Sequence, residues 1–324
     1  MNRREFLKIT AVTAGVLAGG STLKSLIDSS STVVGESRLL MGTIINLTLI
    51  ARTRDEGQKA VQTTFAALEN MVRIFDTRQQ DGPLARLNRD GHLENPPSEL
   101  VAILEQSIAI SELTNGAFDI TVKPVLDAYQ AGSQHIESAL ASVGYRQILI
   151  SDTMIQFANA DVQITLDGIA KGKVVDTGIQ VLGSLGFQHV LVEAGGDLFA
   201  NGSHLDAKPW KIAVQHPRQA DHPWLTSFEI SGQAVATSGD YMHTFTSDYH
   251  LNHIIDPRKG ISPPELCSAT VTAPDTTLAD ALGTAVMVMG LADGLALIDQ
   301  LDGVEALLVT KQLGRYPSPG FPQL

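Results

Sequence analysis

Cysteine and basic residues are scarce in this chain. Cys267 is the only cysteine among the 324 residues, so no disulfide can form within one chain. The chain has 23 Lys and Arg residues against 35 Asp and Glu residues, which gives a formal net charge of −12. Because an acidic surface repels phosphate backbones, we do not expect nucleic acid as a partner.

The chain also lacks a long apolar segment near its start. The apolar run at residues 9–20 is too short to span a bilayer, which takes roughly 20 apolar residues. It follows a twin arginine, Arg3 and Arg4, and this pattern is typical of a twin-arginine secretory signal, although a surface amphipathic helix would look similar. We therefore interpret residues 1–20 as a signal for export to the periplasm and residues 21–37 as a linker. A signal that stays uncleaved would tether the protein to the membrane.

Motifs of several common enzyme classes are missing too. No G-x-G-x-x-G is present, which argues against a Rossmann dinucleotide site. The stretch VATSGDY at 235–241 lacks the G-x-S-x-G pattern, so a serine hydrolase is poorly supported. His250, His253 and Asp256 are spaced three apart, and a strand would place such neighbours on opposite faces, which disfavours zinc. His253 alone is kept as a candidate site residue.

Helical and alternating apolar patterns interleave along the chain without regular β-α-β spacing. This arrangement predicts an α+β fold with mixed or antiparallel sheets and packed helices. Residues 75–92 are polar and turn-rich and predict a long loop or a loop with a turn, and Ser98 is the expected N-cap of the helix that follows. The predicted helices are 55–74, 98–114, 170–185 and 277–290, and the predicted strands include 43–50, 147–157, 162–166 and 304–310.

One predicted helix carries a pair of oxygen donors. Asp280 and Thr284 are four residues apart, so their side chains share a helix face. A carboxylate and a hydroxyl, with a nearby carbonyl, are ligands that suit Mg²⁺. The spacing Thr277-x-x-Asp280 also fits a capping box, in which Asp280 would bond to the helix start instead. The pattern alone leaves both interpretations open.

The stretch LDGIAKG at 166–172 is crowded with groups that suit a phosphate site. Gly168 would let the backbone approach a ligand or ion closely. Lys171 lies near a predicted helix start, where backbone N–H groups and the dipole favour anions. Asp167 would alternatively be the N-cap of that helix. These residues indicate a pyrophosphate-binding site, a plain helix cap, or both.

Eight short motifs occur in a fixed order along the chain. They are MGT (41–43), ARLN (85–88), GAFDITVKP (116–124), LDGIAKG (166–172), GGDLFANG (195–202), ATSGDY (236–241), HIIDPRKG (253–260) and LADALGTAVMVMG (278–290). This series resembles one enzyme family, the FAD:protein FMN transferases or ApbE-like flavin transferases. The resemblance covers about residues 38–312, and it assigns residues 38–324 to a flavin transferase domain.

The resemblance implies a specific reaction and a specific site. Members of the family split the pyrophosphate of FAD with Mg²⁺, attach FMN to a threonine or serine of a target flavoprotein and release AMP. By resemblance the metal ligands are the Gly168 carbonyl, Asp280 and Thr284, and His253 assists transfer to the acceptor hydroxyl. The flavin contacts implied are Met41, Arg78, Ala117, Phe118, Asp119, Thr165, Lys171 and Ile255.

Three residues depart from the pattern that most members share. Thr165 replaces the usual aspartate, Arg78 replaces an aromatic residue in the 75–88 loop, and Gly283 replaces a bulkier or acidic residue. Arg78 can still stack on a flavin or adenine ring, because its guanidinium is planar. The LDGIAKG form is similar to a branch associated with nitrous-oxide respiration, which implies a membrane-bound flavoprotein as acceptor. A Mg²⁺-dependent FAD pyrophosphatase and a periplasmic FAD-binding protein without catalysis are the alternative functions.

Overall fold

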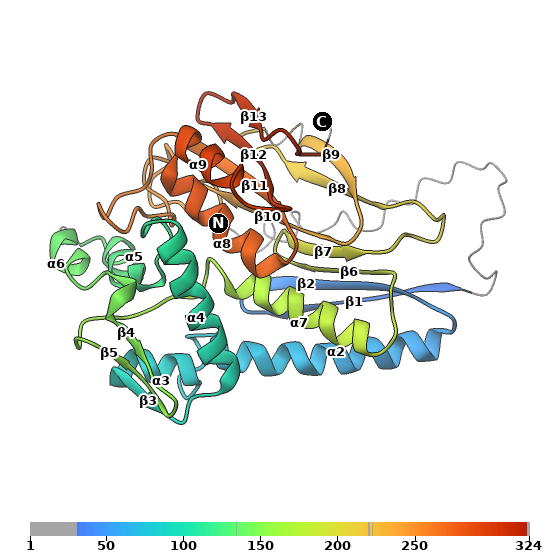
Figure 1. Ribbon diagram of the computed structural model, residues 1–324, viewed down its shortest axis with the longest axis horizontal. Helices are drawn as coiled ribbons and strands as arrows, with labels where there is room; N and C mark the ends of the chain where they lie inside the picture. Colours follow the sequence, from blue (N-terminus) through green and yellow to red (C-terminus); the bar gives the residue numbers. More distant parts are fainter. Residues whose placement is uncertain (1–30, 134, 220, 222, 323–324) are drawn as a thin grey trace.

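The computed structural model describes residues 31–133, 135–219, 221 and 223–322. The proposed signal, residues 1–20, and the first part of the proposed linker lie outside the described residues. Within them, eight strands form one antiparallel sheet in the order β1-β2-β6-β7-β10-β11-β12-β13 (Figure 1). These strands are β1 (Thr32–Leu40), β2 (Thr43–Ala51), β6 (Val190–Ala194), β7 (Asp197–Asn201), β10 (Gln233–Gly239), β11 (Leu266–Ala273), β12 (Glu305–Thr310) and β13 (Arg315–Pro317).

The first hairpin corrects the boundary of the linker. Residues 32–37, expected in the linker, form the first part of β1 and pair with β2, with Thr32 opposite Ala51. Two residues connect the strands, Met41 with φ 50° and Gly42 with φ 75°. A two-residue turn with both φ values positive matches the right-handed twist of the flanking strands, so it fixes the register of the hairpin.

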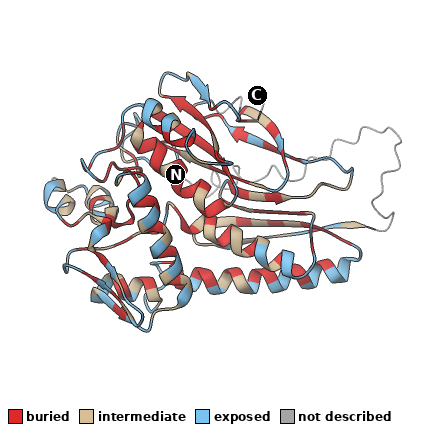
Figure 2. Ribbon diagram, viewed as in Figure 1, coloured by how far each residue is buried: buried red, intermediate tan, exposed pale blue. Residues whose placement is uncertain are grey.

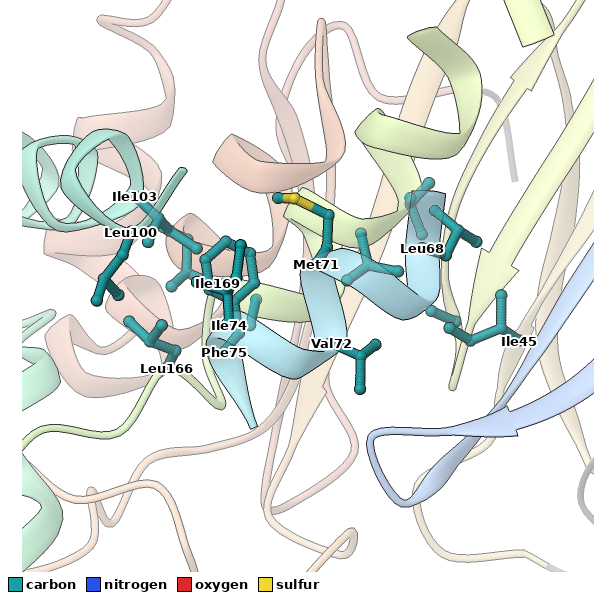
Figure 3. Packing of buried hydrophobic residues seen from close by; sticks show 14 of the residues in the cluster. Ile45, Leu68, Met71, Val72, Ile74, Phe75, Leu100, Ile103, Leu166 and Ile169 are labelled. Atoms are coloured by element: carbon teal, nitrogen blue, oxygen red, sulfur yellow. The ribbon is translucent and has the colours of Figure 1, made fainter. Parts of the chain in front are cut away.

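Helices cover one face of the large sheet (Figures 1 and 2). The largest apolar cluster lies between them and the strands, and Figure 3 shows Phe75 of α2 near Leu166 and Ile169, with Leu68 of α2 near Ile45 of β2. The α-helices of the described residues are α2 (Arg54–Phe75), α3 (Pro83–Asp90), α4 (Ser98–Leu113), α5 (Lys123–Gln130), α6 (Ile136–Leu140), α7 (Ala170–Ser184), α8 (Thr276–Met289) and α9 (Leu291–Ile298), and the 3₁₀ turns are η1 (Ile120–Val122) and η2 (Tyr145–Gln147).

Two small sheets complete the fold. The hairpin β8 (Trp210–Gln215) with β9 (Trp224–Ile230) packs on the opposite face of the large sheet, over residues such as Leu198 and Leu307. Strands β3 (His92–Glu94), β5 (Met154–Phe157) and β4 (Ile148–Ile150) form the other sheet. Because the large sheet is covered on both faces, every residue of β11 is buried. The predicted α+β class with packed helices is confirmed.

Several local predictions were wrong. The stretch 162–166 is not a strand, since the Asn88 side chain bonds both Ile164 N and Ile164 O at 2.8 Å in place of a neighbouring strand. The polar segment 75–92 contains α3. Ser98 is the first residue of α4, after Pro97, and not its N-cap. Within the described residues we find no helix whose length and hydrophobicity would let it span a bilayer.

Candidate active site

The turn that carries Gly168 is anchored by the apolar core. Leu166 and Ile169, on either side of Asp167 and Gly168, are fully buried against α2 and α4 (Figure 3). Thr165 Oγ1 accepts a hydrogen bond from Asp167 N at 3.2 Å, which closes the turn. This side-chain bond is the kind that an aspartate also makes, so Thr165 supports the turn although it carries no charge. Asp167 is exposed and is not the N-cap of α7, which begins after Ile169 without a side-chain cap.

The first turns of α7 and α8 are in direct contact. A Cβ atom at Gly172 would lie 2.6 Å from the carbonyl carbon of Thr276 and 2.7 Å from Cα of Thr277, so glycine is required there. Asp176 on α7 accepts hydrogen bonds from Thr276 N and Thr277 N, both at 2.8 Å, and from Thr277 Oγ1. The true N-cap of α8 is Asp275, whose side chain accepts from Leu278 N. The capping-box interpretation of the α8 start is therefore wrong.

Asp280 faces α7 and joins a buried charge cluster. Lys171 Nζ lies 2.6 Å from Asp197 Oδ2 and 3.1 Å from Asp280 Oδ1, and Gly172 N donates to Asp280 Oδ2 at 3.1 Å. Burial alone would lower the pKa of Lys171, but the two carboxylates outweigh it and hold that pKa above its ordinary value. Burial raises the pKa of Asp280 to about 7, against the opposing charge of Lys171, and it raises the pKa of Asp197 as well.

The cluster is surrounded by further oxygen donors. Thr284, one helical turn after Asp280, has its Oγ1 3.1 Å from where a Cβ at Gly168 would be, and 3.4 Å from Ser238 Oγ. The structure thus brings the Gly168 backbone, Asp280 and Thr284 to one place, with Asp197 beside them. Two buried carboxylates share one ammonium here, so an added cation would balance the remaining negative charge.

These donors fit a magnesium ion. Mg²⁺ prefers oxygen ligands and is usually held by one or two carboxylates together with substrate phosphates. No group of three His, Cys, Asp or Glu side chains in the described part of the chain is arranged to hold a metal ion. A cation at this site would therefore depend on hydroxyl and carbonyl oxygens in addition to the carboxylates.

His253 lies in the long connection between β10 and β11, with one ring nitrogen already occupied. His253 N and Nδ1 both contact the carbonyl oxygen of His243, at 2.9 and 3.1 Å. A carbonyl only accepts, so Nδ1 carries the proton and Nε2 keeps its lone pair. Burial lowers the pKa of His253 to about 4, and the nearby charges of His243 and Lys171 act in the same direction. The imidazole is neutral at pH 7 and can accept a proton at Nε2.

The side chains expected to contact flavin lie in several different parts of the fold, and some of them are buried. Met41 is in the β1–β2 turn, and the Arg78 guanidinium lies against Gly42 of that turn, held by Asp76 through hydrogen bonds of 2.8 and 2.9 Å. Phe118 reaches Gly168, because its ring is 3.4 Å from the Cβ position there. Ala117 and Ile255 are almost fully buried.

Asp119 is held by hydrogen bonds within the local fold. Its Oδ1 accepts hydrogen bonds from Thr121 N and Thr121 Oγ1, and its Oδ2 accepts from Tyr145 N at 2.7 Å. Burial raises the pKa of this carboxyl, which these three hydrogen bonds oppose. The Asp119 side chain is thus committed to the local fold, whereas His253 keeps a lone pair on Nε2.

Three residues at the site were missed from the sequence. Asp197 lies in the GGDLFANG motif, and nothing in that motif marks it as a partner for Lys171. Ser238 was considered only as a nucleophile and lies instead beside Thr284. His243 acts through its backbone carbonyl, which no sequence motif marks.

Comparisons with known proteins agree on one family. The model of the ApbE family matches residues 41–308. The chain is 28% identical to a protein of Vibrio cholerae named FAD:protein FMN transferase, over 84% of this chain and 85% of that protein, and 28% identical to an Escherichia coli K12 protein of the same name, over 84% and 82%.

Solved structures give the same result. The flavin transferase ApbE from Vibrio cholerae has a TM-score of 0.79 at 26% identity, and the ApbE protein from Thermotoga maritima has a TM-score of 0.80 at 27% identity. Each comparison covers 90% of this chain and 98% of the other. The family model spans most of the chain, and the sequence motifs fall at the site just described. This chain therefore belongs to the ApbE family.

Proposed function

We propose that this protein is an FAD:protein FMN transferase that depends on Mg²⁺. An acceptor threonine or serine hydroxyl attacks the phosphorus of the FMN half of FAD. The new bond joins the acceptor oxygen to that phosphorus, the pyrophosphate P–O bond breaks, and AMP leaves with the electron pair. The observation that carries this proposal is the buried cluster of Lys171, Asp197 and Asp280, set beside Thr284 and Gly168.

The residues of the chain divide the work of this reaction. Asp280, Thr284 and the Gly168 carbonyl would hold Mg²⁺, which when bound polarises the phosphoryl group and neutralises developing charge. Lys171 balances the buried carboxylates and keeps Asp280 in place together with Gly172 N. The negative charge of bound FAD would raise the pKa of His253 from about 4 toward 7.

His253 is suited to receive the proton of the acceptor hydroxyl. Its Nε2 lone pair is free because Nδ1 donates to His243 O. A positioned base of this kind contributes about 10²–10⁴-fold to a rate. We therefore expect His253→Ala to lower transfer by this factor while FAD binding persists.

The decisive experiment follows both products of the reaction. The purified protein is incubated with FAD, Mg²⁺ and a flavoprotein domain that carries a candidate acceptor threonine, and intact mass and AMP are measured. A mass gain of one FMN that disappears with EDTA and in Asp280→Ala supports the transferase, while Asp302→Ala, an exposed carboxylate in the turn before β12, is the matched control. AMP release without labelling of any acceptor would indicate the FAD pyrophosphatase. Tight FAD binding without AMP would indicate the FAD-binding protein.

We also propose that the protein acts in the periplasm on a membrane-bound or periplasmic flavoprotein. The support is the twin arginine at Arg3 and Arg4, followed by the short apolar run at 9–20. Changing both arginines to lysine should leave the protein in the cytoplasm, whereas Lys8→Arg should not. Fractionation of cells followed by mass spectrometry of the N-terminus tests export, cleavage and membrane tethering together.

A further inference from the structure

The connection that carries His253 is long and largely irregular. We call residues 240–262, between β10 and β11, the strap. It has only isolated bridges, Thr244 with Asn252 and Asp256 with Ile261, and no strand or helix of its own among the described residues. Such long loops in compact domains are usually functional. Something other than secondary structure must therefore hold His253 in place.

A buried ion cluster lies where the strap begins. Asp240 is fully buried, and its two carboxylate oxygens accept from Arg218 Nη1 and Nη2, each at 2.8 Å. Lys311 Nζ is 3.8 Å from Asp240 Oδ2. The forked geometry of an Arg–carboxylate pair fixes the plane of the guanidinium as well as its position. Arg218 thus presents a flat, fixed cation toward the strap.

Tyr249, in the middle of the strap, is held by both cations of this cluster. The Arg218 guanidinium lies 4.3 Å from the centre of the Tyr249 ring. Lys311 Nζ donates to Tyr249 O at 3.3 Å. Tyr249 also has φ 62°, a left-handed conformation that a bulky residue adopts only when its surroundings impose it. The two contacts account for that conformation.

Hydrogen bonds of Asn252 connect Tyr249 to the backbone on either side of His253. Asn252 Nδ2 donates to Tyr249 O at 3.2 Å, and Asn252 Oδ1 accepts from Ile254 N at 3.0 Å. The backbone of Asn252 is itself fixed, because Ser262 Oγ bonds both Asn252 N and Asn252 O at 2.9 Å. The residues on both sides of His253 are therefore tied to Tyr249.

Other contacts hold the strap at Phe245 and at Gly260. Tyr129 on α5 donates to Gly260 O at 2.7 Å, and its ring stacks on Phe245 at 5.7 Å between ring centres. Arg258 forks onto Asp256 within the strap. These contacts do not include Arg218 or Tyr249. Loss of the ion cluster should therefore loosen the part of the strap around His253 without releasing the whole strap.

From these contacts we infer that Arg218 and Tyr249, with Asp240 and Lys311, are positioning residues that set the place of His253 during transfer. The inference rests on the proposed function. Removing two charges from water costs so much that a buried ion pair is weak evidence for a role in stability alone. A role in fixing the position of His253 explains why the Arg218 guanidinium, the Tyr249 ring and the strained Tyr249 backbone lie together near the proposed base.

The test is a double-mutant cycle between Arg218→Gln and His253→Ala. A displacement of about 1 Å at a reacting group costs on the order of 100-fold. We therefore expect Arg218→Gln to lower kcat by about 10- to 100-fold, with KM for FAD unchanged within about twofold. In the His253→Ala background the same change should have no further effect on kcat, because the group that it positions is gone. Equal loss of kcat in both backgrounds would overturn the inference.

Tyr249 supplies a second variant in case Arg218→Gln fails to fold. Tyr249→Phe keeps the ring under Arg218 and should retain activity, whereas Tyr249→Ala should lose kcat in the same way as Arg218→Gln. Full activity of Tyr249→Ala would refute the role of this contact. Arg89→Gln is the matched control, because it removes an exposed Arg–Asp pair in α3. If the unaltered protein transfers no FMN at all, the proposed function itself has failed and this inference fails with it.

Discussion

The contact between α7 and α8 can be tested with a single methyl group. In Gly172→Ala the new Cβ would lie 2.6 Å from the carbonyl carbon of Thr276, where ordinary contact begins at 3.4 Å. The neighbouring atoms are backbone and cannot rotate away, so the helices must separate by about 1 Å. Overpacking of this kind costs about 1–3 kcal/mol, and we expect the upper end of that range because both sides are main chain.

A second glycine on the same helix provides the control. Gly183, near the exposed end of α7, has nothing within 4 Å of its Cβ position. Gly183→Ala should therefore stabilise the helix by about 0.5–1 kcal/mol through reduced backbone entropy. The two alanine variants should differ by about 4 kcal/mol, which corresponds to roughly 6–8 °C in the unfolding midpoint of a protein of this length.

The assay measures unfolding and function together. Urea and thermal unfolding are followed by circular dichroism, and FMN transfer is titrated with Mg²⁺. Gly172 N bonds Asp280 of α8, and Gly168, just before α7, lies beside Thr284 of α8. Separation of the two helices should therefore weaken Mg²⁺ binding in Gly172→Ala but not in Gly183→Ala. An unfolding midpoint equal to that of the unaltered protein would refute the close approach that the structure shows.

Three further predictions concern ionisable side chains. Lys171→Met leaves Asp197 and Asp280 unbalanced, so we expect about 3–5 kcal/mol of destabilisation in EDTA and a larger stabilisation by added Mg²⁺ than in the unaltered protein, both measured by urea unfolding. Asp176→Ala removes the bonds to the start of α8 and should cost about 1–3 kcal/mol in the same assay. The pKa of His253 is about 4 in the folded protein and near 6.5 when unfolded, so its share of the stability is complete above about pH 6.5 and is lost as pH falls toward 4. Comparing urea midpoints of His253→Gln and the unaltered protein from pH 4 to 8 checks this sign, and an identical slope in both would contradict the low pKa.

The sequence could predict what depends on local pattern. The spacing of Asp280 and Thr284 placed both on one face of α8, and the structure shows both turned toward the Gly168 turn. The capping-box prediction at Thr277 and Asp280 was wrong, because the cap is Asp275, two residues before Thr277. Asp176, which also bonds the start of α8, is 100 residues earlier in the chain than Thr276, and a single sequence does not show partners at such separations.

The strand prediction for residues 162–166 was wrong because a distant side chain bonds the backbone there. Its apolar alternation is real, since Val162, Ile164 and Leu166 are buried. The hydrogen bonds of Ile164 go to the amide of Asn88 and not to a strand, so burial and alternation occur there without a sheet. Periodicity shows which side chains are buried, but not which groups satisfy the backbone.

The order of strands in the large sheet has a consequence for how this architecture can change. The strands lie side by side in the order in which they occur in the chain, so each excursion between them leaves the sheet and returns to the neighbouring position. Gly168 and Lys171 lie in the excursion before β6, His253 in the one before β11, and Asp280 in the one before β12. An excursion can thus lengthen, shorten or be exchanged without reordering the sheet beneath it. The strap is tied to Arg218, Lys311 and Tyr129, which lie outside it, so a change in its length would have to keep those contacts to leave His253 in place.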